Sequence, residues 1–438
     1  MPDIRPFRAL RFDPSNVGDL GLVVAPPYDV IDPEERLRLV ARHPANVVRL
    51  DLPAEEVGDE PDDRYRRAAR TLAGWRSDGT LRKDPHPSIY VYEQTYRVPG
   101  TDVERTQRGF FARLRLEPYG PEGGVLPHER TLSAPKEDRY KLLRATGVNT
   151  SPVVGLYDDP PGNVPGLLAE VTATAAAVDL TDDDRVRHRL WATTADGTGR
   201  DAEIAKALMA AAADGPVTIA DGHHRYETAL RYRDERRMTR SCEEDPAFDY
   251  LLMLFLEASQ PLTVLPTHRL VREAARAVSD LLDQAGELFA VEPVASADEL
   301  VAESHAVALA SGGKGRFSLW TRDGGARLTA RRGAFRSDLP PGGDALRHLD
   351  VTILGAALDH LLGLDAEAVA GGAVGYTKSA DEAIAAVDAG RAEAAFLLEP
   401  TPVASIEAVA RDGDVMPQKS TYFYPKALTG LVINPHEW

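Results

Sequence analysis

The feature that most constrains the fold is the exchange of two hydropathy periods along the chain. Runs in which apolar and polar residues alternate, such as IYVYEQTYRV at residues 89–98, are typical of strands. Runs with apolar residues three or four positions apart, as across residues 63–75, are typical of helices. Because both kinds follow one another from end to end without a repeat of fixed period, the sequence predicts an α/β or α+β mixed fold.

The composition is that of a soluble globular protein. The 438 residues include 51 Lys and Arg against 68 Asp and Glu, which gives a formal net charge of −17. Such a charge repels nucleic-acid phosphates, so we expect no nucleic-acid partner. The apolar run at residues 250–256 is too short to span a membrane, and the first residues lack the apolar region of a signal peptide. We therefore expect a cytoplasmic protein without membrane contact.

Changes in pattern divide the chain into three expected parts. Residues 1–87 show turns and helices, residues 88–270 show alternating strands and helices, and residues 271–438 form an Ala-rich α/β region. The expected strands at residues 89–98 and 108–116 are close enough in the chain to form a hairpin. We expect the central part to be a phosphate-binding core, because the two motifs described next lie within it.

The sharpest motif is ADGHHR, a turn between a short apolar strand and a helix. Such a turn directs free backbone N–H groups toward an anion. Gly222 permits close backbone approach, Arg225 offers a fork of donors for phosphate oxygens, and His223 and His224 can exchange protons near neutral pH. The motif therefore predicts a phosphate cradle. The alternative is that Asp221 caps the helix and the histidines are exposed residues at its start.

The segment VLPHERT supplies a second candidate group. A carboxylate at Glu129, beside His128, can take the proton from an attacking hydroxyl. Lys136, Asp138 and Arg139 follow in the next expected helix and can steer phosphate or metal. Taken alone, the segment is also explained by an ordinary polar turn.

Two further segments carry residues that suit a pocket. Lys419 and Lys426 in MPQKSTYFYPK can close over a phosphate, or they can belong to a half-buried strand with a polar face. Tyr28 and Asp29 in APPYDVI can line a pocket or form a turn that Asp29 stabilises. His268 is expected at a helix start.

The order of the two motifs resembles that of the free-serine kinases, which are built on the ParB/sulfiredoxin fold. The run ADGHHRYETA is similar to the characteristic turn of that fold, and PHE precedes it. The resemblance implies a ParB/sulfiredoxin-like core with N-terminal and C-terminal α/β extensions. It also implies that Glu129 is the catalytic base and that the turn holds nucleotide phosphates. Sulfiredoxin chemistry itself requires a cysteine where this chain has His223, and Cys242 is expected to be structural.

The whole chain also resembles the bacterial family catalogued as domain of unknown function 1015. The segments APPYDVI, LPHERT, DRYKLLRATGVNTSPV, ADGHHRYETA and MPQKSTYFYPK carry this resemblance, which runs from near residue 6 to near residue 434.

These observations lead to an expected function. The protein would transfer a phosphoryl group from ATP or ADP, with Mg²⁺, to the hydroxyl of a small metabolite, with a serine-like amino acid as the first acceptor to test. A metal-dependent hydrolase that uses the same His, Asp and Glu side chains and a non-catalytic nucleotide sensor are the alternatives. The sequence assigns neither metal ligands nor an oligomeric state. The expected catalytic residues are Glu129, His128, Asp221 and His223, and the expected nucleotide-binding residues are Gly222, His224, Arg225, Lys419 and Lys426.

Overall fold

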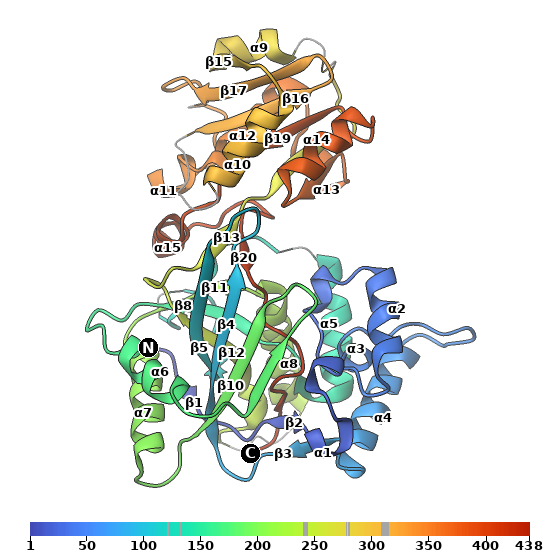
Figure 1. The fold of residues 1–438 in the computed structure, drawn as a ribbon, viewed down its shortest axis with the longest axis vertical. Coiled ribbons are helices and arrows are strands. Elements are labelled where there is room, and N and C mark those ends of the chain that lie inside the picture. Colours follow the sequence, from blue (N-terminus) through green and yellow to red (C-terminus); the bar gives the residue numbers. More distant parts are fainter. Residues whose placement is uncertain are drawn as a thin grey trace.

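The computed structural model describes residues 1–120, 122–131, 133–239, 244–276, 278, 281–307, 315–335 and 337–438. Cys242 lies outside these ranges. Figure 1 shows two α/β units stacked along the long axis of the molecule, each built around its own sheet. The mixed α/β class predicted from the hydropathy pattern is confirmed.

The larger sheet has nine strands of mixed direction. Its strand order is β6-β11-β8-β12-β5-β4-β10-β9, and β1 pairs with β5 as well. The pairs β11–β6 and β12–β8 are parallel, and the others are antiparallel. The strands are β1 (Ile4–Arg5), β4 (Ser88–Arg97), β5 (Glu104–Arg115), β6 (Val125–Leu126), β8 (Val153–Tyr157), β9 (Val178–Thr181), β10 (Arg187–Thr194), β11 (Val217–Asp221) and β12 (Tyr250–Glu257).

The centre of this sheet is the hairpin that the alternating pattern predicts. Strands β4 and β5 pair antiparallel along their length. Ile89 and Val91 of β4 lie in one hydrophobic core, whereas Tyr90 and Tyr92 lie in another. Successive residues of a strand point to opposite faces, so both faces of the sheet are buried.

Helices cover the face that carries Ile89 and Val91. Tyr140, Leu168, Leu208 and Tyr226, one from each helix, are buried in the same core as these strand residues. In the view of Figure 1, α6 and α7 appear toward the left of this unit and α8 and α5 toward its right. The four helices are α5 (Ser133–Thr146), α6 (Val164–Thr172), α7 (Arg200–Ala213) and α8 (His223–Thr239).

Both ends of the chain cover the opposite face. Phe7 from the N-terminal segment and Leu428 and Val432 from the C-terminal segment share a core with Tyr90. The helix predicted across residues 63–75 is α4. The N-terminal elements are β2 (Leu10–Phe12), α1 (Pro14–Val17), the 3₁₀ turns η1 (Leu20–Leu22) and η2 (Tyr28–Val30), α2 (Pro33–Arg42), α3 (Val48–Asp51), α4 (Asp63–Ser77) and β3 (Leu81–Lys83).

The second unit contains a six-stranded antiparallel sheet with the order β15-β17-β16-β19-β14-β18. Its strands are β14 (His268–Val271), β15 (Phe289–Val294), β16 (Arg316–Thr321), β17 (Gly324–Ala330), β18 (Val374–Thr377) and β19 (Ala394–Leu397). Its helices are α9 (Leu281–Leu288), α10 (Ala297–Val307), α11 (Asp344–Arg347), α12 (Asp350–Leu362), α13 (Ala366–Ala370), α14 (Ala380–Asp388) and α15 (Val403–Arg411).

The chain passes between the units twice. Strand β13 (Thr263–Leu265) leads into the second unit, and it pairs antiparallel with β20 (Tyr422–Tyr424), which leads back. Residues 416–435 are called the returning segment below. This segment runs from the junction along the first unit and ends where β21 (Asn434–Pro435) pairs with β7 (Val148–Asn149). The MPQKSTYFYPK segment is therefore held at the junction of the two units (Figure 1).

Candidate functional site

A cavity of about 270 Å³, called the central cavity below, brings the two sequence motifs together. Residues from β11, α8, the loop after β6, the returning segment and the end of β18 line it. All nine predicted site residues are among them: His128, Glu129, Asp221, Gly222, His223, His224, Arg225, Lys419 and Lys426. The catalytic and nucleotide-binding roles assigned to them stay predictions.

The turn between β11 and α8 has the backbone that the motif predicts. The pairing of β11 with β8 shifts register between Ile219 and Asp221, which turns the end of the strand. Gly222 has φ +89°, and a Cβ there would lie 3.0 Å from Nε of Arg225. Glycine is thus required both for the left-handed conformation and for the close approach. Helix α8 starts at His223, so the N–H groups of its first turn point toward the cavity end of the helix.

Asp221 lies between two cations. Its Oδ2 accepts a hydrogen bond from Nη2 of Arg225 at 2.6 Å, and its Oδ1 accepts one from Nζ of Lys426 at 2.7 Å. Burial opposes ionisation, but Lys426 and Arg225 hold the pKa of the Asp221 carboxyl well below its usual range. Arg225 also donates to the backbone oxygen of Pro152. Arg225 therefore braces the turn, and Asp221 anchors the returning segment to it.

His128 and His223 are buried and neutral. The Nδ1–H of His128 donates to the backbone oxygen of Ile219, and its Nε2 accepts from the hydroxyl of Thr421 at 2.8 Å. The Nε2 of His223 accepts the backbone N–H of His128 at 3.2 Å. Burial lowers the pKa of His128 to about 4 and that of His223 well below its ordinary value. These bonds tie the loop after β6 to β11, α8 and the returning segment.

Glu129 is a half-buried carboxylate that faces the returning segment. Its Oε1 accepts the backbone N–H of Lys419 at 3.0 Å. Burial raises the pKa of Glu129, although the N–H and the ammonium of Lys419 and the charge of Lys426 act in the opposite direction. A carboxylate with a raised pKa is a stronger base than an ordinary glutamate once it is ionised.

The backbone at Lys419 is held in a strained conformation. Its φ is +57°, in the left-handed region that costs a non-glycine residue about 1 kcal/mol or more. Its N–H bonds to Glu129, and its backbone oxygen accepts a hydrogen bond from Nη2 of Arg269 at 3.1 Å. Arg269 belongs to β14 of the second unit and is itself buried. The second unit thus fixes the turn that holds Glu129.

Other predicted residues lie outside the central cavity or have a different role. Lys136 pairs with Glu227 at 2.8 Å, and Arg139 donates to the backbone oxygen of Asp51 at 2.5 Å. Asp138 is bound by Arg64, Tyr65 and Arg139, so this group ties α4 to α5. Tyr28 and Asp29 form the turn η2 and also line the central cavity.

Sequence reasoning missed the contribution of the second unit. Tyr376, Thr377 and Lys378, at the end of β18, line the central cavity together with Tyr422. Lys378 stands between a strand and a helix, the same local arrangement as the ADGHHR turn. This position between a strand and a helix could have marked Lys378 as a candidate binding residue. No local pattern, however, reveals which distant segment the position faces.

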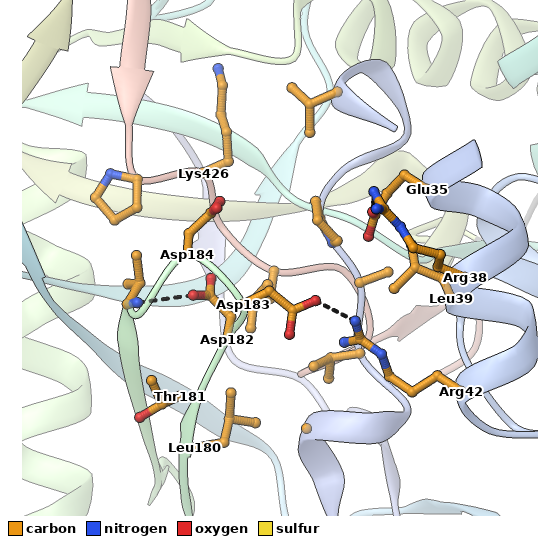
Figure 2. A pocket seen from close by; sticks show the side chains of 18 of the residues that line it. Glu35, Arg38, Leu39, Arg42, Leu180, Thr181, Asp182, Asp183, Asp184 and Lys426 are labelled. Carbon is orange, nitrogen blue, oxygen red and sulfur yellow. Dashed lines mark hydrogen bonds and ion pairs between the residues drawn. The ribbon is translucent and has the colours of Figure 1, made fainter. Parts of the chain in front are cut away.

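A second cavity of about 960 Å³, called the adjoining cavity, meets the central one. The two share Val30, Lys378, Tyr422 and Lys426. Figure 2 shows three consecutive aspartates on one wall of the adjoining cavity, with α2 opposite. Asp183 pairs with Arg42, and Asp182 accepts the backbone N–H of Val186 at 2.9 Å. Asp184 has no hydrogen-bond or ion-pair partner among the described residues. Its burial, and to a smaller extent the charges of Asp182 and Asp183, raise the pKa of its carboxyl.

Within the described ranges, His, Cys, Asp and Glu side chains form no group of three or more placed to hold a metal ion. None of the helices in those ranges is both long enough and apolar enough to cross a bilayer.

Comparison with known proteins identifies the family. The family model described as "Protein of unknown function (DUF1015)" matches residues 4–352, so the chain belongs to that family. No curated protein matches the chain.

Similar solved structures share little sequence with this chain. A conserved hypothetical protein from Pyrococcus furiosus is 13% identical over 72% of this chain and 90% of its own, with a TM-score of 0.33. A free serine kinase in complex with AMP is 12% identical over 72% of this chain and 86% of its own, with a TM-score of 0.35. A mutant free serine kinase in complex with ADP is 13% identical over 75% and 90%, with a TM-score of 0.35.

Proposed function

We propose that the protein transfers the terminal phosphoryl group of ATP or ADP to the hydroxyl of a small metabolite, with a serine-like amino acid as the favoured acceptor. The observation that carries the proposal is the central cavity itself. It joins Glu129, the Gly222 turn and two lysines that lie almost 300 residues beyond Glu129 in the chain. A carboxylate beside an anion-binding turn is the arrangement that phosphoryl transfer to a hydroxyl requires.

The charge of the cavity supports binding of an anion. Five basic residues line it against three acidic ones, although the chain as a whole carries a net charge of −17. The N-terminus of α8 adds the positive end of a helix dipole. The basic residues are Arg130, Arg225, Lys378, Lys419 and Lys426, and the acidic ones are Asp29, Glu129 and Asp221.

Glu129 is the group suited to act as base. The acceptor oxygen attacks the terminal phosphorus, Glu129 takes the hydroxyl proton, and the bond from that phosphorus to the bridging oxygen breaks. The nucleotide leaves one phosphate shorter. His128 and His223, which are neutral and hydrogen-bonded, would act as positioning residues that keep Glu129 beside the turn.

A Mg²⁺ ion bound with the nucleotide would neutralise charge on the phosphate oxygens. The carboxylates that face the central cavity fit an ion held mainly by phosphates and water. Glu129 and Asp221 are already hydrogen-bonded, whereas Asp29 is exposed and has no ion-pair partner among the described residues. Asp29 is therefore the side chain that would complete its coordination.

Two observations support an acceptor of the serine type. The order of the PHE and ADGHHR motifs resembles that of the free-serine kinases. Asp184, which is unpaired among the described residues, lines the adjoining cavity together with Tyr422 and Lys426. A carboxylate there suits the ammonium group of an amino acid.

The test is a transfer assay on the full chain. Purified protein is incubated with ATP or ADP, Mg²⁺ and a panel of hydroxyl compounds that includes L-serine, and product is followed by ³¹P NMR. The proposal predicts a new phosphate monoester in at least one mixture. Nucleotide binding without product would identify a sensor instead, and product formation from a phosphate ester without nucleotide would identify a hydrolase.

A further inference from the structure

The second unit contributes a lysine to the place where the two cavities meet. Lys378 follows β18 directly and precedes α14. Its Nζ lies 4.0 Å from the centre of the Tyr422 ring, and Nζ of Lys426 lies 4.4 Å from the centre of the same ring. Tyr422 belongs to the returning segment, and its ring forms a cation–π contact with one lysine from each unit.

The lysines around this ring are incompletely neutralised. Lys426 pairs with Asp221, but neither Lys378 nor Lys419 forms an ion pair with a carboxylate in the described residues. Desolvation, followed by the charges of Lys426 and Lys419, lowers the pKa of Lys378. Like charges held together in this way are destabilising without an anion between them. The arrangement of these lysines is therefore suited to bind a ligand that carries more than one negative charge.

The position of the lysines relative to Glu129 indicates which part of the ligand they meet. The backbone N–H of Lys419 bonds to Glu129, and Lys426, which pairs with Asp221, lines the same cavity as Glu129. The reacting phosphorus must also lie close to Glu129, because the base and the phosphorus flank the same hydroxyl. Lys378 lines the same cavity and shares the Tyr422 ring with Lys426, so it is placed to meet the reacting end of a bound nucleotide.

The geometry points to Lys378 as a ligand of the nucleotide phosphates beyond the α-phosphate, which makes the second α/β unit part of the donor site. This inference rests on the proposed function and deepens it. It also gives the Ala-rich C-terminal region a role, since the site would be incomplete with the first unit alone. Binding of ATP or ADP would then link the two units through Lys378 and Lys426.

The experiment measures affinity for AMP, ADP and ATP by isothermal titration calorimetry with Mg²⁺ present. The proteins are the wild type, Lys378→Met, Lys378→Arg and the control Lys206→Met, whose lysine is exposed on α7 away from both cavities. Loss of one charge-assisted contact predicts that Lys378→Met weakens ADP and ATP binding about tenfold or more. AMP binding should change by less than about twofold, and Lys378→Arg should retain most of the affinity.

The outcomes separate this inference from the proposed function. If the wild type binds ADP or ATP and Lys378→Met binds them equally well, or loses AMP affinity to the same extent, the assignment of Lys378 is wrong while the proposed function stands. If the wild type binds none of the three nucleotides, the proposed function fails and this inference fails with it. Because the Lys378 side chain is exposed and lies among like charges, its substitution by Met should not lower the thermal unfolding midpoint, which is checked on the same samples.

Discussion

Asp221→Asn tests whether the carboxylate between Arg225 and Lys426 holds the site together. The carboxylate accepts hydrogen bonds of 2.6 and 2.7 Å from these two cations. Hydrogen bonds to charged groups contribute about 1.5–3 kcal/mol each, and the amide oxygen of asparagine retains one of them in weaker form. The expected loss of local stability is therefore about 2–4 kcal/mol.

Hydrogen exchange measured by mass spectrometry reports this loss where it occurs. Peptides from β11 and α8 should exchange about 30- to 1,000-fold faster in Asp221→Asn at pH 7. Asp179→Asn is the matched control, because its pair with Arg187 is exposed and should contribute less than about 0.5 kcal/mol.

The pH dependence follows from the lowered pKa of Asp221. A carboxylate with a lowered pKa contributes its stability above its unfolded pKa, and the contribution disappears as pH falls through the folded value. The difference in local stability between the wild type and Asp221→Asn should thus be constant between about pH 5 and 8 and become smaller at acidic pH. Equal exchange rates for Asp221→Asn and the wild type at pH 7 would refute the anchoring role.

Three further predictions concern the same cavity. Gly222→Ala should lower stability by about 1–3 kcal/mol, because φ at this position is +89° and the new Cβ would press on Arg225. The loss should be seen as a lower thermal unfolding midpoint, and an unchanged midpoint would contradict this prediction. Lys419→Gly keeps the N–H that binds Glu129 and relieves the strain of a left-handed non-glycine residue. Calorimetry should therefore show equal or higher stability, together with weaker ATP binding because the ammonium is lost. A lower thermal midpoint would contradict this prediction. Glu129→Gln should be at least as stable as the wild type at pH 7. The pKa of the Glu129 carboxyl is raised in the folded protein, so its ionisation lowers the stability of the wild type once the pH exceeds that pKa. A clear loss of stability would show that the ionised Glu129 stabilises the fold.

The elements that could be predicted are those with a strong local pattern. The β4–β5 hairpin follows from alternation, and the strand and helix around Gly222 lie within a few residues of where they were expected. The nine site residues predicted from the motifs all line the central cavity, together with others, such as Lys378, that were not predicted. Local pattern suffices there because Gly, Pro and polar clusters mark turns wherever they occur.

Features set by distant contacts were not predicted correctly. His268 lies in β14, not at a helix start, because its segment pairs with both β18 and β19. Arg225 was expected to bind phosphate, yet its guanidinium is engaged by Asp221 and the backbone of Pro152. In each case the partner is remote in sequence or invisible to periodicity.

The central claim is that Glu129 takes a proton while the turn and the lysines hold the nucleotide. It is tested most directly by the rate of phosphoryl transfer in Glu129→Gln, with ATP or ADP affinity measured on the same protein. Glu137→Gln, an exposed glutamate paired with Arg231, is the control. The account predicts a loss of transfer of about 100-fold or more with nucleotide affinity unchanged within about threefold. Transfer at a near wild-type rate in Glu129→Gln would contradict it.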